Sequence, residues 1–408
     1  MQAIQYVKSI PRWLTTRLLG KRWPALYTGP TACIRLAEVP EPSLPGPRWV
    51  RIATRMSGIC GSDLAAITAK GTPYFSPLTS APFVLGHENV GVVAEIGSAV
   101  TRGRVGQRVA IQPSLCCAVR EVPCCQACAA GHFGACEHVM QGTLSPGIQT
   151  GYCRDTGGGW SPRFVAHEEQ VYPLPDTLPD ETAVLLEPLA CAIHALLRAR
   201  PADGQTALVL GCGTIGLLTI AALRRLFPRV RIAAAARYPH QERLANSLGA
   251  DLVWGPSANL YEETCRLTKA RMLRPELGKP VVLGGMDLVF DCVGSSNTLD
   301  DALRLCRSQG AVVLVGMPGE LNRIDGTPLW HKEIRVLGAY TYGMEEYQGE
   351  RLSTFTLAER LLLAEPDRFA TLVGARFRLS DYRTAIDTAL HTGRSGVAKT
   401  VFVFEPIA

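Results

Sequence analysis

The pattern of apolar and polar residues differs between the two halves of this 408-residue chain. In the first part, short apolar runs lie between Gly and Pro residues, for example at 49–56, 90–97 and 107–113. Alternation with a period of two, bounded by such turn residues, predicts short strands in a mostly antiparallel β domain. Residues 114–165 are rich in Cys and Gly and have few periodic segments, so we predict loops there.

From about residue 180, helical spacing alternates with continuous apolar runs. Segment 180–199 has helical periodicity, and Pro188 is expected to kink or divide it. The pattern then predicts strands at 206–211, 230–236, 287–294 and 311–316, and helices at 214–226, 240–249 and 299–310. This βαβ rhythm predicts a doubly wound parallel sheet. The pattern loosens from about 345, and a strand is expected within 395–404.

Length and composition indicate a globular protein of two domains. Single cores stop growing at about 250–300 residues, which this chain exceeds. We expect one domain at 1–185, completed by 345–408, and a second at 186–344. Apolar residues make up 47% and charged residues 19%, which excludes a disordered chain. The net charge of +6 favours anionic ligands such as phosphates and does not indicate nucleic-acid binding.

The first ten residues contain no long apolar stretch and no small-residue cleavage site, so neither a signal peptide nor a transmembrane span is expected. We therefore expect a cytoplasmic protein. In a reducing compartment cysteines rarely form disulfides, and clustered ones more often bind metal. Six of the fourteen cysteines lie within 116–136.

A glycine motif directly follows the first predicted strand of the βαβ region. Gly211, Gly213 and Gly216 have the spacing G-x-G-x-x-G, which allows a tight turn, a close approach to a pyrophosphate and close helix–strand packing. Thr214 and Ile215 begin the predicted helix, whose free N–H groups would face the phosphates. We therefore predict a dinucleotide site.

The residues about 20 positions further on favour NADP(H) over NAD(H). An acid is usual there when the ribose 2′-hydroxyl is bound, but this chain has Ala236 followed by Arg237. An acid would repel a 2′-phosphate, whereas an arginine binds one through paired N–H groups. The alternative is that Arg237 is a solvated residue at a strand end.

Three residue types suited to zinc occur in the first domain. His87 and Glu88 lie in "GHENVG", and Cys60 lies in "GICGSD" further upstream. A thiolate, an imidazole and a carboxylate form an open zinc site with a position left for substrate. Glu187 is a second acid, just before the βαβ region. Each residue alone has an ordinary alternative: a buried small thiol, a surface acid or a first-turn helix acid.

These motifs together resemble the zinc-dependent medium-chain alcohol dehydrogenase/reductase superfamily. "GICGSD", "GHENVGVVAEIGSAV", "GQRV" and "LGCGTIG" occur in the order of that family, and the resemblance covers nearly the whole chain. It implies an α/β protein with a GroES-like β-rich catalytic domain and a Rossmann domain. It also implies a catalytic zinc on Cys60 and His87, with Glu187 as third ligand as in polyol and threonine dehydrogenase-like members. Glu88 is the alternative ligand.

The resemblance also assigns roles around this zinc. Ser62 would hydrogen-bond the substrate oxygen and begin a proton relay, and Asp63 would orient His87. Liver-type alcohol dehydrogenases complete the relay with a histidine at the position of Ala65, so the proton route stays open here. The cofactor contacts implied near the nicotinamide are Cys292, Val293, Gly294, Val315 and Gly316.

A second, structural zinc is implied by the cysteine-rich loop. Cys125, Cys128 and Cys136 have the spacing of the last three ligands of that site in the family. The position expected for the first ligand is Val122. Cys117 is our choice for the fourth thiolate, with Cys116 and Cys124 as alternatives.

Residues 7–26 form an insertion that the family pattern does not explain. Apolar residues at helical spacing alternate with Lys and Arg, so we predict a basic amphipathic helix. A lid or a subunit contact is the favoured interpretation, and a membrane surface is the alternative. The cations would also suit a phosphorylated or carboxylated substrate.

The resulting hypothesis is a zinc-dependent oxidoreductase that uses NADP(H). Its substrate would be a secondary alcohol, a polyol, an amino alcohol or the matching carbonyl compound, and assembly as a homodimer or homotetramer is expected. The alternatives are a zinc-independent double-bond reductase of the same superfamily and a non-catalytic NADP-binding protein. The zinc-ligand set argues against the former, and the missing relay histidine favours the latter.

Overall fold

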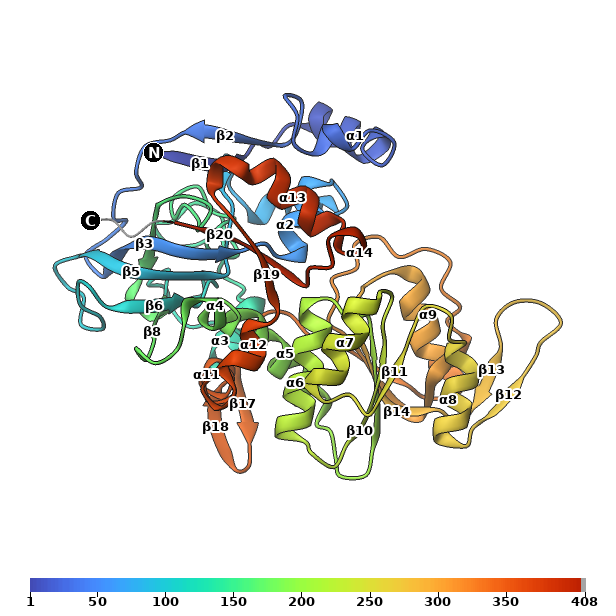
Figure 1. Cartoon of the computed structure of the whole chain (residues 1–408). Coiled ribbons are helices and arrows are strands. Elements are labelled where there is room, and N and C mark those ends of the chain that lie inside the picture. Colours follow the sequence, from blue (N-terminus) through green and yellow to red (C-terminus); the bar gives the residue numbers. More distant parts are fainter. Residues whose placement is uncertain (405–408) are drawn as a thin grey trace. The chain divides into compact units, whose positions relative to one another are not determined.

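The computed structural model describes residues 1–404, which form two compact units (Figure 1). The first unit contains Met1–Glu187 and the described residues from Leu362 onward, and the second contains Pro188–Leu361. The chain therefore returns to the first unit later than residue 345, where the sequence pattern loosens.

A seven-stranded sheet forms the centre of the first unit. Its order is β19-β20-β3-β5-β6-β8, with β7 paired to β3, and only β19 and β20 pair in parallel. The strands are β3 (Trp49–Gly58), β5 (Asn89–Ile96), β6 (Arg108–Ile111), β7 (Arg163–His167), β8 (Val171–Pro173), β19 (Val373–Phe377) and β20 (Lys399–Val403). Alternate residues such as Val50, Ile52 and Val93 are fully buried, which is the period-two burial expected of a sheet with one face on the core.

A smaller sheet of order β2-β1-β4 holds the N-terminus. Its strands are β1 (Gln2–Tyr6), β2 (Ile34–Glu38) and β4 (Phe83–Val84), and the N-terminal insertion between β1 and β2 contains α1 (Ile10–Leu19) and η1 (Pro24–Tyr27). The other helices of this unit are α2 (Gly61–Ile67), η2 (Pro73–Leu78), α3 (Gln126–Ala129), η3 (Phe133–Ala135), η4 (Glu168–Gln170), α4 (Asp180–Ala183), α12 (Pro366–Ala370), η5 (Leu379–Asp381), α13 (Tyr382–Leu390) and α14 (Thr392–Ser395).

The second unit is built on a six-stranded parallel sheet of order β11-β10-β9-β14-β15-β16. Its strands are β9 (Thr206–Leu210), β10 (Arg231–Ala235), β11 (Leu252–Trp254), β14 (Met286–Asp291), β15 (Cys306–Leu314) and β16 (Arg335–Gly338). The order reverses at β9, as in dinucleotide-binding folds. The fold class predicted from the sequence, a GroES-like β domain with a Rossmann domain, is confirmed.

Helices and two hairpins complete the second unit. The helices are α6 (Thr214–Leu226), α7 (Pro239–Leu248), α8 (Leu260–Thr268), α9 (Ser296–Leu305) and α10 (Thr327–His331), while α5 (Leu186–Ala199) and α11 (Thr354–Ala364) span the unit boundaries. The hairpins are β12 (Arg271–Leu273) with β13 (Val281–Leu283) and β17 (Met344–Tyr347) with β18 (Glu350–Ser353).

Two of the helical predictions have different outcomes: the expected division of segment 180–199 is confirmed, whereas the helix 299–310 ends early. Segment 180–199 divides into α4 and α5 before Pro188, which lies in the first turn of α5, where a missing N–H costs no helical hydrogen bond. The predicted helix 299–310 is wrong beyond Leu305. Residues from Cys306 onward pair with β14 instead, and Gln309 has a left-handed φ of 58° that no helix accommodates.

Segment Asp180–Ala199 is also apolar and long enough to cross a membrane by composition alone. Within the protein, however, 89% of its most apolar window is buried. Burial of this kind is typical of a core helix.

Candidate functional site: a thiolate–imidazole cluster and a glycine loop

Strand pairing brings the two predicted zinc motifs together. β3 ends at Gly58, just before Cys60, and His87 and Glu88 immediately precede β5. Ser57 pairs with Asn89, and the Gly58 amide donates to the Glu88 carbonyl at 2.8 Å. A Cβ at position 58 would lie 1.9 Å from a Glu88 carboxylate oxygen and 2.9 Å from the Lys399 side chain, so a larger residue would displace these two side chains.

One ligand atom each from Cys60, His87 and Glu88 lie within 4.8 Å of one another. His87 and Glu88 are buried, and Cys60 is partly exposed. The hydroxyl of Ser62 lies 3.3 Å from His87 Nε2. Ser62, like Cys60, is partly exposed.

Asp63 fixes the geometry of this cluster. Its Oδ1 lies 3.4 Å from His87 Nδ1, and its Oδ2 accepts a 3.0 Å hydrogen bond from the Cys60 amide. A carboxylate on one ring nitrogen leaves the other free to bind a metal ion. Burial lowers the pKa of His87, but the negative charges of Asp63 and Cys60 outweigh it and raise this pKa well above its ordinary value.

A buried lysine from the far end of the chain completes the cluster. Lys399, at the start of β20, forms an ion pair with Glu88, and the two side chains are only 2% and 1% exposed. Its ammonium also donates to the Ile59 carbonyl at 3.1 Å. Burial lowers the pKa of Lys399, but the charges of Glu88 and Cys60 prevail and raise it. Sequence reasoning missed this residue, although a lysine within the apolar run VAKTVFV was a signal that could have found it.

Glu187 lies close to the cluster but outside the group of mutually adjacent ligand atoms. It is buried at the first turn of α5, and its charge contributes to the raised pKa of Lys399. Among the described residues, the carboxylate that joins Cys60 and His87 is that of Glu88.

The donor set fits a zinc ion. The Cys60 sulfur, the His87 ring and the Glu88 carboxyl group lie in a largely buried setting, and Lys399 contacts Glu88. A thiolate, an imidazole nitrogen and a carboxylate are the ligand types of catalytic zinc sites, which keep a fourth position open. The chemistry of these donors favours a bound metal ion.

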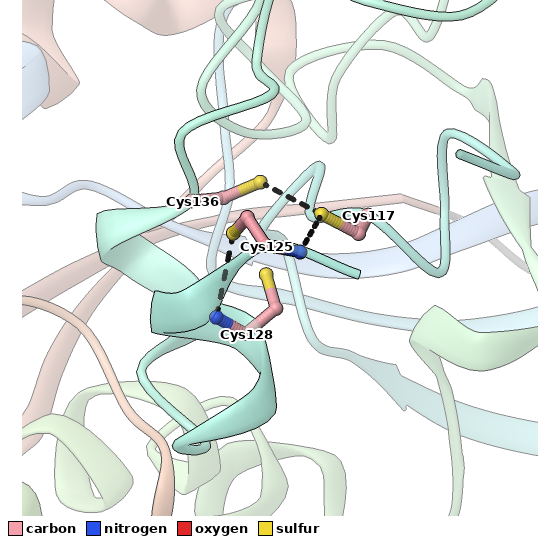
Figure 2. A group of neighbouring side chains, drawn as sticks. All are labelled: Cys117, Cys125, Cys128 and Cys136. Atoms are coloured by element: carbon pink, nitrogen blue, oxygen red, sulfur yellow. Dashed lines mark hydrogen bonds between the residues drawn. The ribbon is translucent and has the colours of Figure 1, made fainter. Parts of the chain in front are cut away.

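Four cysteines converge in the loop region that follows β6 (Figure 2). The sulfurs of Cys117, Cys125, Cys128 and Cys136 lie within 4.8 Å of one another, and the sulfurs of Cys117 and Cys136 are 3.6 Å apart. Thiolates bound to one tetrahedral zinc at about 2.3 Å would be about 3.8 Å apart. The alternatives for the fourth ligand lie outside this group: Cys116 is buried but its sulfur is not among these four, and Cys124 is exposed.

Backbone amides point at these sulfurs. The amide of Cys125 donates to the Cys117 sulfur at 3.3 Å, and the amide of Cys128 donates to the Cys125 sulfur at 3.5 Å (Figure 2). Burial raises the pKa of the Cys125 thiol, but hydrogen bonds from the amides of Glu137 and Cys128 lower it to about 6. Burial raises the pKa of Cys136 to about 12. Donors on sulfur favour the thiolate form that binds zinc.

In the second unit, the glycine motif forms the turn between β9 and α6. Gly211 has φ +91°, a conformation that favours glycine. A Cβ on Gly216 would lie 1.8 Å from the Gly211 carbonyl oxygen, so the helix can approach the strand only with glycine there. A Cβ on Gly213 would meet open space. Thr214 and Ile215 are the first residues of α6, whose N-terminus follows this loop.

The remaining predicted cofactor residues lie at the carboxyl ends of the strands. Cys292, Val293 and Gly294 follow β14, and Val315 and Gly316 follow β15. The buried Asp291 carboxylate accepts the amides of Val293 and Gly294 at 3.0 Å each, and burial raises its pKa. Sequence reasoning missed this acid, which fixes the loop from within.

Ala236 and Arg237 follow β10 at the same edge of the sheet. Ala236 is buried, and Arg237 is exposed with its guanidinium 5.5 Å from the Tyr238 ring centre. Its amide donates to Gln241 Oε1 at 3.0 Å. The guanidinium is therefore available to solvent beside the strand end where a ribose is bound in this fold.

Comparison with known proteins agrees with the fold. Residues 46–176 match the family model for the alcohol dehydrogenase GroES-like domain, and residues 214–355 match the zinc-binding dehydrogenase model. The L-idonate 5-dehydrogenase of Vitis vinifera is 28% identical over 356 residues, which is 87% of this chain and 88% of that protein. Sorbitol dehydrogenase 1 of Saccharomyces cerevisiae is 26% identical and covers 93% of this chain and 98% of its own.

Solved structures of named dehydrogenases have the same fold. The 2R,3R-butanediol dehydrogenase of Bacillus subtilis superposes with a TM-score of 0.72 and 25% identity, covering 99% of each chain. A putative zinc-binding dehydrogenase of Sinorhizobium meliloti, bound to NADP, superposes with a TM-score of 0.69 and 25% identity over 98% of this chain and 99% of its own.

The fold and these relatives define an oxidoreductase with a dinucleotide-binding domain. The chain belongs to the zinc-containing alcohol dehydrogenase family of the medium-chain superfamily, in the branch whose relatives are named as polyol dehydrogenases. The resemblance inferred from the sequence motifs is thereby confirmed.

Proposed function

We propose that this protein is a zinc-dependent dehydrogenase that transfers hydride between NADP(H) and a secondary alcohol, a polyol or an amino alcohol, or the matching carbonyl compound. The observation that carries the proposal is the convergence of Cys60, His87 and Glu88 in one buried cluster. Relatives named for sorbitol, idonate and butanediol favour a polyol or diol among these substrates.

In this proposal Cys60 and His87 hold the catalytic zinc, with Glu88 as the nearest carboxylate and Glu187 as the alternative. A zinc ion at this position would supply a Lewis acid for the substrate oxygen. Asp63 holds the ring of His87 so that Nε2 faces the substrate side. Lys399 holds the Glu88 carboxylate in place. Glu88 then either binds the zinc directly or lies beside it.

Ser62 would receive the substrate hydroxyl, because its own hydroxyl lies 3.3 Å from His87 Nε2 and its side chain is partly exposed. It can accept the proton of the alcohol and pass its own proton onward, as a first relay residue does. The bound nicotinamide would supply the hydride acceptor, and the glycine loop with α6 would hold its pyrophosphate.

We assign the 2′-phosphate of NADP to Arg237, with Ala236 leaving room for it. The exposed guanidinium and the lack of an acid at these two positions support this choice. Four thiolates, Cys117, Cys125, Cys128 and Cys136, would hold the structural zinc. We further propose that the protein is a homodimer or homotetramer in the cytoplasm. Light scattering tests the oligomeric state, and cell fractionation tests the location.

The test compares turnover with cofactor binding in Cys60→Ser. The proposal expects loss of NADP-linked oxidation of polyols, retained NADPH binding by fluorescence titration, and loss of one zinc per chain. Unchanged turnover in this variant would favour the zinc-independent reductase instead. Absence of turnover by the wild type with polyols, amino alcohols and aldehydes would favour a protein that only binds NADP.

A further inference from the structure

A cavity of about 580 Å³ in the first unit is lined by three arginines from three separate elements. Arg12 comes from α1 of the N-terminal insertion, Arg35 from β2 and Arg383 from α13, which all lie in the same part of this unit (Figure 1). No lining residue is acidic, and none belongs to the Cys60–His87–Glu88 cluster. The cavity is therefore distinct from the proposed catalytic site.

Neutral partners hold each guanidinium in position. Arg12 donates to the Ala32 carbonyl at 2.8 Å, and Arg35 donates through two nitrogens to Gln5 Oε1 at 2.8 and 3.2 Å. Arg383 donates to the Tyr382 hydroxyl at 3.2 Å and lies 5.6 Å from the centre of that ring. An arginine has five N–H donors, so each of the three retains donors for a ligand.

No carboxylate neutralises these charges within residues 1–404, where none of the three arginines forms an ion pair. The sequence accentuates the imbalance, because residues 1–37 contain six Lys or Arg and no Asp or Glu. Glu38, the first acid of the chain, pairs with the N-terminal amine at 3.3 Å. Three like charges around one opening favour an anion of matching charge.

We propose that this cavity binds a phosphoryl group. Guanidinium forks match the oxygens of a phosphate in pairs, and the Ser380 hydroxyl at the rim adds a neutral donor. The volume accommodates a phosphate together with part of the molecule that carries it. The phosphate belongs either to a small soluble metabolite or to the head group of a phospholipid.

The exposed apolar face of α1 provides a way to test whether the phosphate belongs to a phospholipid. Ile10, Leu14 and Leu18 follow one another at a spacing of four residues and are 71%, 45% and 75% exposed. They lie on the helix that carries Arg12. A lipid whose head group occupied the cavity would bring this apolar stripe to a bilayer, whereas a soluble phosphate would not involve it.

The experiment uses the full-length enzyme with NADP present. NADP then occupies the glycine loop, so inorganic phosphate cannot bind there. Calorimetry with inorganic phosphate, at constant ionic strength, is compared between wild type, Arg35→Gln/Arg383→Gln and the control Arg104→Gln. Arg104 is exposed in the same unit and does not line the cavity. The double variant should weaken binding at least tenfold, Arg35→Lys should retain part of it, and Arg104→Gln should not change it.

A parallel arm measures co-sedimentation with phosphatidylcholine vesicles with and without phosphatidic acid. Vesicle binding that is lost in both Arg35→Gln/Arg383→Gln and Leu14→Ser/Leu18→Ser identifies a lipid head group. Phosphate binding that is indifferent to the leucine substitutions identifies a soluble phosphate. If neither probe binds, or if the double arginine variant binds as the wild type does, the proposal is overturned. Dehydrogenase turnover, expected to be unchanged in the arginine variants, reports that each is folded and is independent of the outcome.

Discussion

Replacing Lys399 by Met tests whether the buried pair with Glu88 supports the cluster. Both side chains are almost completely removed from water, so solvent screens their interaction very little. Removing one partner of such a pair leaves an uncompensated buried charge, which costs about 3–5 kcal/mol of folding free energy. We therefore expect Lys399→Met to lower the free energy of unfolding by about that amount.

The second substitution, Glu88→Gln, distinguishes a charge effect from a packing effect. Replacing both members of a buried pair is often nearly neutral, so Lys399→Met/Glu88→Gln should recover most of the loss. Lys332→Met is the matched control, because this lysine is also buried but donates only to the carbonyls of Arg304 and Cys306. Lys332→Met leaves no buried carboxylate without a partner. Adding Glu88→Gln should therefore not restore the stability of this variant.

Urea unfolding followed by tryptophan fluorescence measures all four variants, with midpoints compared at equal zinc content. The buried Trp160, whose indole donates to the Gly58 carbonyl at 3.1 Å, reports directly on this region. A cost below about 1 kcal/mol for Lys399→Met, or a double variant no more stable than the single one, would show that the charge of Lys399 does not stabilise Glu88.

Three further predictions concern the cofactor, the second metal and the response to acid. Arg237→Gln should raise the KM for NADP at least tenfold with little change for NAD, and Ala236→Asp should reverse the preference; equal KM changes for both cofactors would contradict the assignment. Cys117→Ser should remove one zinc per chain and lower the Tm, whereas Cys116→Ser should retain it, as metal analysis would report. Hydrogen bonds to Glu168 outweigh burial and lower its pKa to about 2. Its stabilisation is thus present above its ordinary pKa and lost as pH falls toward 2, so Glu168→Gln should destabilise at pH 7 and much less near pH 2.

The parts of the protein that local sequence determines were predictable. The glycine loop is one continuous segment whose backbone conformation and close contacts demand glycine at Gly211 and Gly216. β9 and α6 flank it as predicted, because a short apolar run and a helical repeat are each visible within a dozen residues.

What sequence reasoning missed depends on contacts between distant segments. Lys399 meets Glu88 only because β20 pairs with β3 beside the start of β5. Cys117, by contrast, was chosen from the sequence, although local spacing left Cys116 and Cys124 open; the path of the loop brings Cys117 to the other three thiols. The end of α9 at Leu305 likewise follows from pairing with β14, which overrides the helical pattern of the following residues.

The zinc content of the purified enzyme, compared between wild type and Cys60→Ser, shows whether Cys60 holds a metal ion. We predict about two zinc ions per chain in the wild type and about one in the variant, with the Cys117–Cys136 loop still loaded. An equal zinc content in the two proteins would show that Cys60 holds no metal and would contradict the catalytic site described above.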